Sequence, residues 1–191
     1  MAQKVEQMEE RTLSRREFVR VVRNGAVILI IPQTLRSHLV GRPSALVPQE
    51  QIQSSYPYKF FTAEEAASVE AMSARIIPSD QTPGAREAKA VRFIDHMLAT
   101  EYKIDQVTYR DGLRRLNEVS QSRFSRLFAS LNEADQDGIL IQMERRGIPD
   151  WESAGDFFSL VRGHTIEGLF SDPKHQGNAR GVGWRLVGLS V

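Results

Sequence analysis

The chain has 191 residues, of which 41% are hydrophobic and 26% are charged, a composition typical of globular proteins and not of disordered ones. Its formal net charge of +1 hides an asymmetry, because residues 1–45 hold eight Lys/Arg against four Asp/Glu and the rest holds 17 against 20, a balance with no electrostatic footprint for nucleic acid. The chain has no cysteine, which excludes disulfides, thiolate catalysis, Cys-ligated zinc and a self-ligated iron–sulfur cluster.

The first 45 residues have the pattern of an export signal. Paired arginines, Arg15 and Arg16, are followed by Phe18 and then by a short apolar stretch, Gly25–Ile31. That stretch is far shorter than the roughly 18 residues of a membrane-spanning helix. The pair resembles the twin-arginine signal, by which folded proteins are exported. We therefore predict a twin-arginine signal over residues 1–45, read by the twin-arginine translocase, and a periplasmic location. An ordinary amphipathic helix and an uncleaved leader are the alternatives.

The pattern of residues 46–191 predicts one all-α domain, an orthogonal bundle of five or six helices with an irregular Gly-rich C-terminal loop. No stretch shows the alternation of a β-strand. Residues 46–61 have no period and are expected to form an extended arm. Helices are expected from the capping box Thr62-Ala63-Glu64-Glu65 to Pro78, from about Ala85 to Thr100, from about Gln106 to Ser120, in a short piece at Phe124–Phe128, from the capping box Ser130-Leu131-Asn132-Glu133 to about Arg146, and from Trp151 to Phe170.

Each predicted helix carries apolar residues at the 3.6-residue period and is expected to bury them. The expected core positions are Ala66, Val69, Met72, Ile76, Val91, Ile94, Leu98, Leu113, Leu116, Ala154, Phe158, Val161 and Thr165. Phe157 is next to Phe158, and because adjacent helical positions point about 100° apart, one of the two rings can face a partner. Gly163 and Gly168 each cost about 1 kcal/mol relative to alanine in a helix. They are expected to mark places where another backbone approaches closely.

No catalytic motif is present in the sequence. It lacks a dinucleotide-binding glycine fingerprint, a nucleophile elbow and a His-Glu-x-x-His pair. The run Asp135–Gly138 resembles a calcium loop but lies inside a predicted helix and lacks the acidic twelfth position. His96 is expected to be a packing residue. His164, Asp172 and His175 could converge as a metal or acid–base site, but their spacing is unspecific. We predict no catalytic, cofactor-binding or metal site in this chain.

Several motifs, taken in chain order, resemble those of the gluconate 2-dehydrogenase subunit 3 family. They are Phe61-Thr62-x-x-Glu65, Ile76-Ile77-Pro78-Ser79-Asp80-x-x-Pro83-Gly84-Ala85, Tyr109-x-x-Gly112-Leu113, Phe157-Phe158-x-Leu160, Thr165-x-x-Gly168-x-Phe170, and Asp172-Pro173-x-His175-x-Gly177-Asn178 followed by Trp184 and Gly188. Two departures are the pair His175-Gln176 where Tyr-Gly is usual, and the last three residues, Leu189-Ser190-Val191, in place of an aromatic-Pro-Gly tail.

The resemblance implies a small, cofactor-free subunit of an exported FAD-dependent dehydrogenase that acts on sugars or polyols. The FAD belongs to a large partner subunit similar to glucose-methanol-choline-type flavoproteins. Such partners commonly lack an export signal of their own, so the folded complex would travel on the small subunit's leader. Electrons would leave the flavin through an iron–sulfur or haem c centre on another chain.

Contacts with the large subunit are expected mainly in the Gly-rich C-terminal loop. The predicted partner-binding residues are Asp172, Pro173, His175, Gly177, Asn178, Trp184 and, on the last helix, Phe157. The aromatic residues Tyr56, Tyr58, Phe157 and Trp184 predict exposed apolar surface on the isolated chain. The alternative function is a free-standing helical binding protein tethered to the membrane by an uncleaved leader. A third is a small enzyme that uses the two C-terminal histidines.

Overall fold

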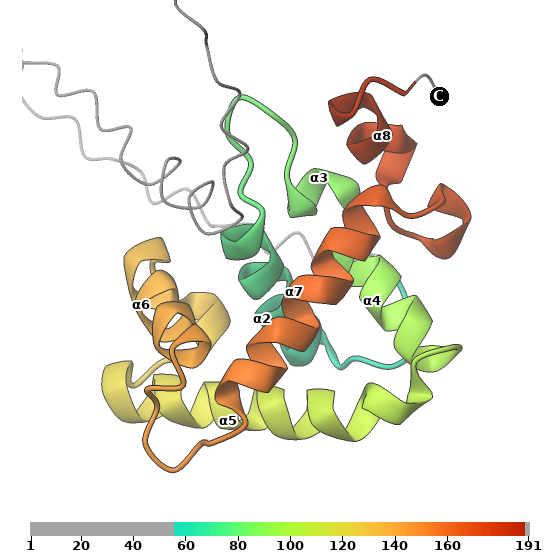
Figure 1. The fold of residues 1–191 in the computed structure, drawn as a ribbon. Coiled ribbons are helices and arrows are strands. Elements are labelled where there is room, and N and C mark those ends of the chain that lie inside the picture. Colours follow the sequence, from blue (N-terminus) through green and yellow to red (C-terminus); the bar gives the residue numbers. More distant parts are fainter. Residues whose placement is uncertain (1–55, 190–191) are drawn as a thin grey trace, which may run out of the picture. The chain divides into compact units, whose positions relative to one another are not determined.

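The computed structural model describes residues 56–189 (Figure 1). The predicted signal, with Arg15, Arg16 and Phe18, lies outside the described residues, as does its boundary at residue 45. Every regular element in the described part is helical, which confirms the all-α prediction. The α-helices are α2 (Ala63–Ile76), α3 (Ala85–Ala88), α4 (Ala90–Ala99), α5 (Gln106–Phe124), α6 (Glu133–Glu144), α7 (Ala154–Phe170) and α8 (Val182–Leu186). The short 3₁₀ turns are η1 (Lys103–Asp105), η2 (Phe128–Ser130), η3 (Pro173–His175) and η4 (Ala179–Gly181).

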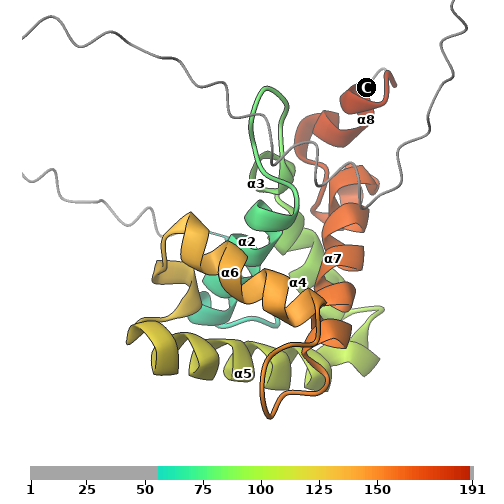
Figure 2. The same cartoon turned by 60° about the vertical axis from the view of Figure 1, so that its left-hand side comes forward.

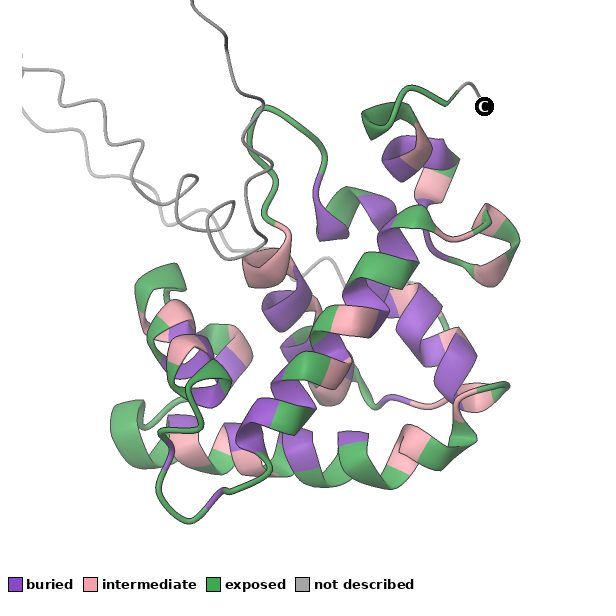
Figure 3. Cartoon of the chain, viewed as in Figure 1, coloured by how far each residue is buried: buried purple, intermediate pink, exposed green. Residues whose placement is uncertain are grey.

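Helix α7 is the centre of the bundle and contacts each of the other six α-helices of the described part. In Figures 1 and 2 it rises from α5, which lies across the base, to the C-terminal helix α8. The predicted apolar stripe of this helix is buried, as the 3.6-residue period requires, and Phe157 is buried beside it (Figure 3). Of the other expected core positions, only Ile76 is half-buried, and the rest are buried.

Helices α5 and α7 meet where Gly112 of α5 packs against Phe157 of α7. An ideal Cβ placed on Gly112 would lie 2.4 Å from Cδ2 of Phe157, so the Phe157 ring occupies the space that any other side chain would take. Tyr109, one turn earlier on α5, meets the same ring edge-to-face at 5.8 Å between centroids. The glycine therefore allows the two aromatic rings to pack inside the helix crossing.

Several predicted helix boundaries are wrong, among them the start of the last helix, which lies at Ala154 and not at Trp151. The helix expected over residues 85–100 is two helices, because Lys89 adopts a left-handed conformation with φ of 59°. Ala88 and Ala90 would point about 200° apart on one continuous helix, and the break lets both be fully buried. Helix α5 continues to Phe124, and the expected short piece is reduced to η2. Asn132, not Ser130, caps α6, because its side chain accepts the N–H of Asp135. These breaks and the small helix α8 raise the number of α-helices in the described part above the expected five or six.

The arm before α2 is fixed by a buried carboxylate on α4. Asp95 accepts hydrogen bonds from the backbone N–H groups of Lys59, Phe60 and Phe61, each at 2.9 Å. The carboxylate is fully buried, and these charge-assisted bonds provide its compensation. Arg110 adds a hydrogen bond to the carbonyl of Phe60 at 2.7 Å and stacks over its ring. The described part of the predicted arm is therefore irregular in structure but firmly held. The capping box at Thr62 and Glu65 that follows it is confirmed.

No helix in the described range, residues 56–189, combines the length and the apolar character that a membrane span needs.

Candidate partner-binding surface

The C-terminal segment, residues 171–189, folds back onto the end of α7. After Phe170 the chain passes through η3 and η4 and then forms α8, which contacts α7 and α3. Four residues between 176 and 181 have a positive φ: Gln176, Asn178, Arg180 and Gly181. Asparagine and glycine adopt this conformation at little cost, whereas arginine does so only under tertiary constraint. The segment predicted as an irregular loop is thus a defined sequence of tight turns followed by a short helix.

Asn178 holds these turns together. Its backbone N–H donates to the carbonyl of Gly168 at 2.7 Å, its side-chain amide donates to the carbonyl of Ser171 at 2.9 Å, and its Oδ1 accepts the N–H of Gly183 at 2.8 Å. The side chain is fully buried, so each bond satisfies a group that water does not reach. Gly183 itself approaches α7 so closely that an ideal Cβ would lie 1.9 Å from the carbonyl oxygen of Leu169. Asn178 thereby joins the end of α7 to the start of α8.

Replacing Asn178 with alanine is expected to detach α8 from α7 and to lower the free energy of unfolding by about 2 kcal/mol, because the buried N–H of Gly183 and the half-buried carbonyl of Ser171 lose their partner. The fluorescence of Trp184 reports the change, because in the wild type its indole N–H donates to the carbonyl of Phe170 at 2.8 Å. The other tryptophan, Trp151, is buried near the start of α7. A red shift of tryptophan emission with unchanged helicity is the expected signal. Emission like that of the wild type would contradict the role of Asn178, and Asn132→Ala, which removes a different side-chain cap, is the control.

The structure separates the predicted partner-binding residues into two groups. Gly177, Asn178 and Phe157 are buried within the chain, so their side chains shape the fold and offer no surface. The other four are accessible and lie on or beside η3 and α8: Asp172, Pro173, His175 and Trp184. Among these, Asp172 caps η3 by accepting the N–H of Lys174 at 3.0 Å. That bond lowers the pKa of Asp172, so the carboxylate is ionised.

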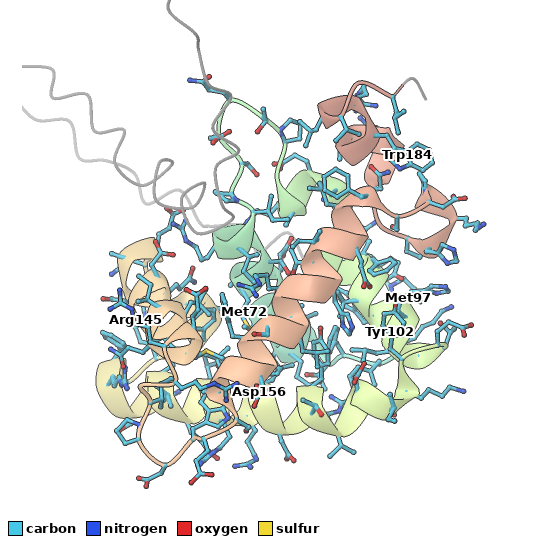
Figure 4. The ribbon with its side chains drawn as sticks, viewed as in Figure 1. Met72, Met97, Tyr102, Arg145, Asp156 and Trp184 are labelled. Carbon is cyan, nitrogen blue, oxygen red and sulfur yellow. The ribbon has the colours of Figure 1, made fainter. Side chains whose placement is uncertain are left out.

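The most exposed apolar side chains were not identified from the sequence. Five form what we call the C-terminal apolar surface, and each is between 39% and 58% exposed: Ile166, Phe170, Leu186, Val187 and Leu189. Phe170 and α8 are joined by the Trp184 hydrogen bond, and the N–H of Leu189 donates to the Trp184 carbonyl at 2.9 Å. Figure 4 shows Trp184 at this end of the molecule. The signal that could have found them is the apolar content of the last residues, which the glycine-rich pattern obscured.

A second exposed apolar pair lies elsewhere, at the start of α5. Ile104 is 88% exposed and Val107 is 70% exposed. Of the aromatic residues expected to create exposed surface, Tyr56 and Tyr58 are half-buried and pack edge-to-face on each other. Arg92 lies over the Tyr56 ring at 4.7 Å from its centroid. In the described residues, the large exposed apolar side chains are therefore aliphatic residues, Phe124 and Phe170, and not the tyrosines.

His164 does not meet Asp172 and His175. It lies on the buried side of α7, where its ring stacks on Tyr102 at 4.7 Å and its Nδ1 shares a 3.0 Å hydrogen bond with the hydroxyl of Tyr109. Its Nε2 is 3.9 Å from Asp105. His175 instead neighbours His96, 6.1 Å away between ring centroids. Figure 4 shows Tyr102, which marks the His164 group, well apart from Trp184. The candidate acid–base site is therefore divided between two places, and that hypothesis loses its geometric basis.

Burial determines the protonation states of Tyr109 and His164. It raises the pKa of Tyr109 well above 10.0, so the phenol keeps its proton and can donate it to His164. Burial also lowers the pKa of His164 below 6.5, although Glu167 and Asp105 act in the opposite direction. The imidazole is accordingly neutral at neutral pH, with Nδ1 available as an acceptor. Tyr102 completes the group by donating its hydroxyl to Glu167 at 3.0 Å.

Acidification from about pH 7.5 to about pH 5.5 is expected to destabilise the chain through His164. A histidine whose folded pKa lies below its ordinary 6.5 contributes stability that is complete above that value and is lost as the pH falls through the folded pKa. The slope for one such group cannot exceed about 1.4 kcal/mol per pH unit. Urea denaturation of wild type, His164→Gln and His175→Gln over this range is the measurement. Only His164→Gln should flatten the dependence, and an unchanged slope in that variant would refute the assignment.

The run that resembles a calcium loop is part of α6, as expected. The Asp137 carboxylate accepts two hydrogen bonds from Arg75 on α2, at 2.8 and 2.9 Å, so it serves to join two helices. Over residues 56–189, no group of three or more His, Asp or Glu side chains has the arrangement of a metal site.

A hollow of about 270 Å³ lies between α5 and the segment before α7. Arg115 and Arg123 line it together with Trp151, but both guanidinium groups are already bonded within the chain. Arg115 donates to the carbonyl of Asp150, and Arg123 donates to the side chain of Gln142 at 2.8 Å. The hollow also lies among residues that no sequence motif singled out. It has no arrangement of groups that points to catalysis.

Comparison with known proteins identifies the family. The sequence model of a family described as gluconate 2-dehydrogenase subunit 3 matches residues 63–190, which includes every helix from α2 to α8. No curated protein and no solved structure matches the chain. The matched range is about two thirds of the sequence and contains both the turn before α3 and the C-terminal segment. The family name describes a subunit of a dehydrogenase, which implies a dehydrogenase partner. This chain belongs to the gluconate 2-dehydrogenase subunit 3 family.

Proposed function

We propose that this chain is the non-catalytic small subunit of an exported FAD-dependent sugar or polyol dehydrogenase. It binds and stabilises the FAD-containing large subunit and carries it through the twin-arginine pathway to the periplasm. Electrons from the flavin pass to an iron–sulfur or haem c centre on another chain. The family match over residues 63–190 is the observation that carries the proposal.

Two features of the chain support this role. The Arg15-Arg16 pair before a short apolar stretch has the form of a signal for proteins that fold before export, which suits a subunit that must bind its partner first. The described residues also form a complete core of their own around α7, and they leave apolar side chains exposed at the C-terminal end. An exposed apolar patch of this kind is typical of a protein-binding site. The residues Asp172, Pro173, His175 and Trp184 lie in the same C-terminal segment and are accessible, which supports a partner contact at this end.

The proposal is tested by purifying the tagged full-length chain from its native host and recording an absorbance spectrum of the eluate. A second, larger polypeptide and the visible absorption of protein-bound flavin are the expected result. The partner obtained in this way also allows the sugar or polyol substrate to be identified. A colourless eluate that contains this chain alone would reject the proposal in favour of a free-standing, membrane-tethered binding protein.

Replacing Arg15 and Arg16 together by lysine is expected to leave the complex assembled but trapped in the cytoplasm. The charge is conserved, so only a receptor that distinguishes arginine from lysine responds to the change. Flavoprotein in periplasmic and cytoplasmic fractions is the measurement, and Arg20→Lys with Arg23→Lys in the same leader is the matched control. Undiminished periplasmic flavoprotein in the Arg15→Lys/Arg16→Lys variant would exclude the twin-arginine route.

A further inference from the structure

One glycine of α7, Gly163, makes no close contact among the described residues that would require a glycine at its position. The helix contains Gly155, Gly163 and Gly168, and each lowers its helix propensity. An ideal Cβ on Gly155 would lie 2.8 Å from the Arg146 side chain, and one on Gly168 would lie 3.1 Å from the Cα of Ala90. An ideal Cβ on Gly163 meets nothing within 4 Å. The close approach predicted for Gly168 is thus confirmed, whereas for Gly163 no such approach is present among residues 56–189.

Gly163 lies on the outward side of α7, in line with two exposed apolar residues. At 100° per residue, Gly163, Ile166 and Phe170 fall within about 60° of one another on the helix circumference. Figure 3 shows that exposed segments alternate with buried ones along α7. Ile166 and Phe170 belong to the C-terminal apolar surface, which continues over α8 through Leu186 and Val187. A bare stretch of helix backbone therefore borders an exposed apolar surface.

The segment after α7, which supplies three of the five surface residues, is opposite in net charge to the rest of the domain, although the exposed Glu167 lies between Ile166 and Phe170 on α7. Residues 171–189 hold three Lys/Arg against one Asp, whereas residues 56–170 hold 14 Lys/Arg against 18 Asp/Glu. Arg180 and Arg185 are exposed, and Arg185 directly precedes Leu186 and Val187 in the chain. A binding partner that offers an apolar centre and acidic groups opposite these arginines would complement this segment.

Charge disfavours two other occupants. The leader, residues 1–45, has eight Lys/Arg against four Asp/Glu and would bring positive charge to a positive rim. A second copy of the chain, docked through the same surface on both protomers, would oppose the two basic rims directly. The dehydrogenase partner that the family implies meets neither objection.

We propose that the large dehydrogenase subunit docks on the C-terminal apolar surface and packs an element of its own against the exposed backbone of α7 at Gly163. This inference rests on the proposed function and specifies which part of the small subunit binds. The occupying surface of the large subunit is apolar at its centre and acidic at its edge. Gly163 allows the close approach, as small residues do where two helices pack tightly.

The test compares variants of the full-length tagged chain for capture of the flavoprotein that co-purifies with the wild type. Leu186→Ser/Val187→Ser removes the apolar centre, Gly163→Leu blocks the close approach while keeping a good helix former, and Arg180→Glu reverses one rim charge. Each is expected to lower the captured flavin at least tenfold, and added salt should weaken the wild-type complex. The matched control is Ile104→Ser/Val107→Ser, which removes two even more exposed apolar residues from α5 and its preceding turn.

The outcomes separate this inference from the proposed function. Wild-type chain that captures no flavoprotein rejects both. Wild-type capture that survives the three surface changes, or that the control abolishes equally, rejects only the docking surface. Dimerisation of the chain that Leu186→Ser/Val187→Ser abolishes would assign the surface to self-association. Binding to phosphatidylglycerol vesicles that the same variant abolishes, with flavoprotein capture unchanged, would assign it to the membrane. Circular dichroism melting of each purified variant verifies that the loss of capture is not a loss of folding.

Discussion

The Asp95→Ala variant is expected to lose about 3 kcal/mol of folding free energy and to release residues 56–61 from α4. Three backbone N–H groups donate to this carboxylate, and each loses its partner when the carboxylate is removed. A buried donor left without an acceptor costs about 1–3 kcal/mol. Water reaches part of this segment once it is released, so the expected loss of folding free energy for each of the three N–H groups stays near the lower end of that range. Urea denaturation gives the free energy, and limited trypsinolysis after Lys59 reports release of the arm.

Two control variants distinguish the loss of the hydrogen bonds to the arm from the loss of a negative charge. Asp95→Asn keeps one acceptor oxygen and is expected to lose less than the alanine variant, because that oxygen can still accept from Phe60 and Phe61. Asp111→Ala removes an exposed carboxylate that lies 3.8 Å from Arg114 on the same helix, and it should change stability little. If Asp95→Ala resisted trypsin at Lys59 as well as the wild type does, the carboxylate would not be what holds the arm.

Replacing Gly112 with alanine is expected to destabilise the chain by about 2 kcal/mol, although alanine is the better helix former. The propensity gain is about 1 kcal/mol. Against it, the new Cβ would lie 2.4 Å from the Phe157 ring, which is itself buried and cannot move away without disturbing Tyr109. Forcing an extra carbon into a packed core costs about 3 kcal/mol at the upper end of the usual range, so the clash outweighs the propensity. Thermal and urea denaturation of the purified domain measure the difference.

The same substitution at Gly163 should have the opposite sign. Nothing lies within 4 Å of the Cβ that Gly163→Ala would add, so the propensity gain of about 1 kcal/mol is expected in full. Each substitution adds one methyl group to a glycine in a helix. The difference between the two variants therefore reflects only the surroundings of that methyl group. Stabilisation by Gly112→Ala would show that the α5–α7 crossing is looser than the structure indicates, and destabilisation by Gly163→Ala would show that the space beside Gly163 is not open.

The sequence predicted what depends on local periodicity and local capping. The apolar stripe at Ala154, Phe158 and Val161 followed from the 3.6-residue period, and the start of α2 followed from the hydrogen bonds between Thr62 and Glu65. Both are decided by residues within a few positions of each other. The break at Lys89 was not predictable in this way, because a lysine has no preference for a left-handed conformation. Burial of Ala88 and Ala90 against separate neighbours imposes it.

The candidate surface shows the same division. The motif Asp172–Asn178 and Trp184 predicts partner contacts at the C-terminal end, yet Asn178 is buried there and the exposed apolar residues lie on either side of it in the chain. A short motif does not reveal whether a polar side chain bonds inward or outward, since that depends on where Gly168 and Ser171 are brought by the fold. Asp95 carried no signal at all, because its three donors are more than 30 residues away in the chain.

By itself, then, the sequence determined the helical class, most helix positions, the core of α7, the export-signal pattern and the family resemblance that residues 63–190 confirm. These properties are set by periodicity, capping and short motifs, which operate over a few residues. Only the tertiary structure decided that Asp95 holds the arm, that His164 is separated from His175, and that Gly163 faces outward beside exposed Ile166 and Phe170. Each of these depends on contacts or gaps between segments distant in sequence, where burial, and not residue type, determines what a side chain does.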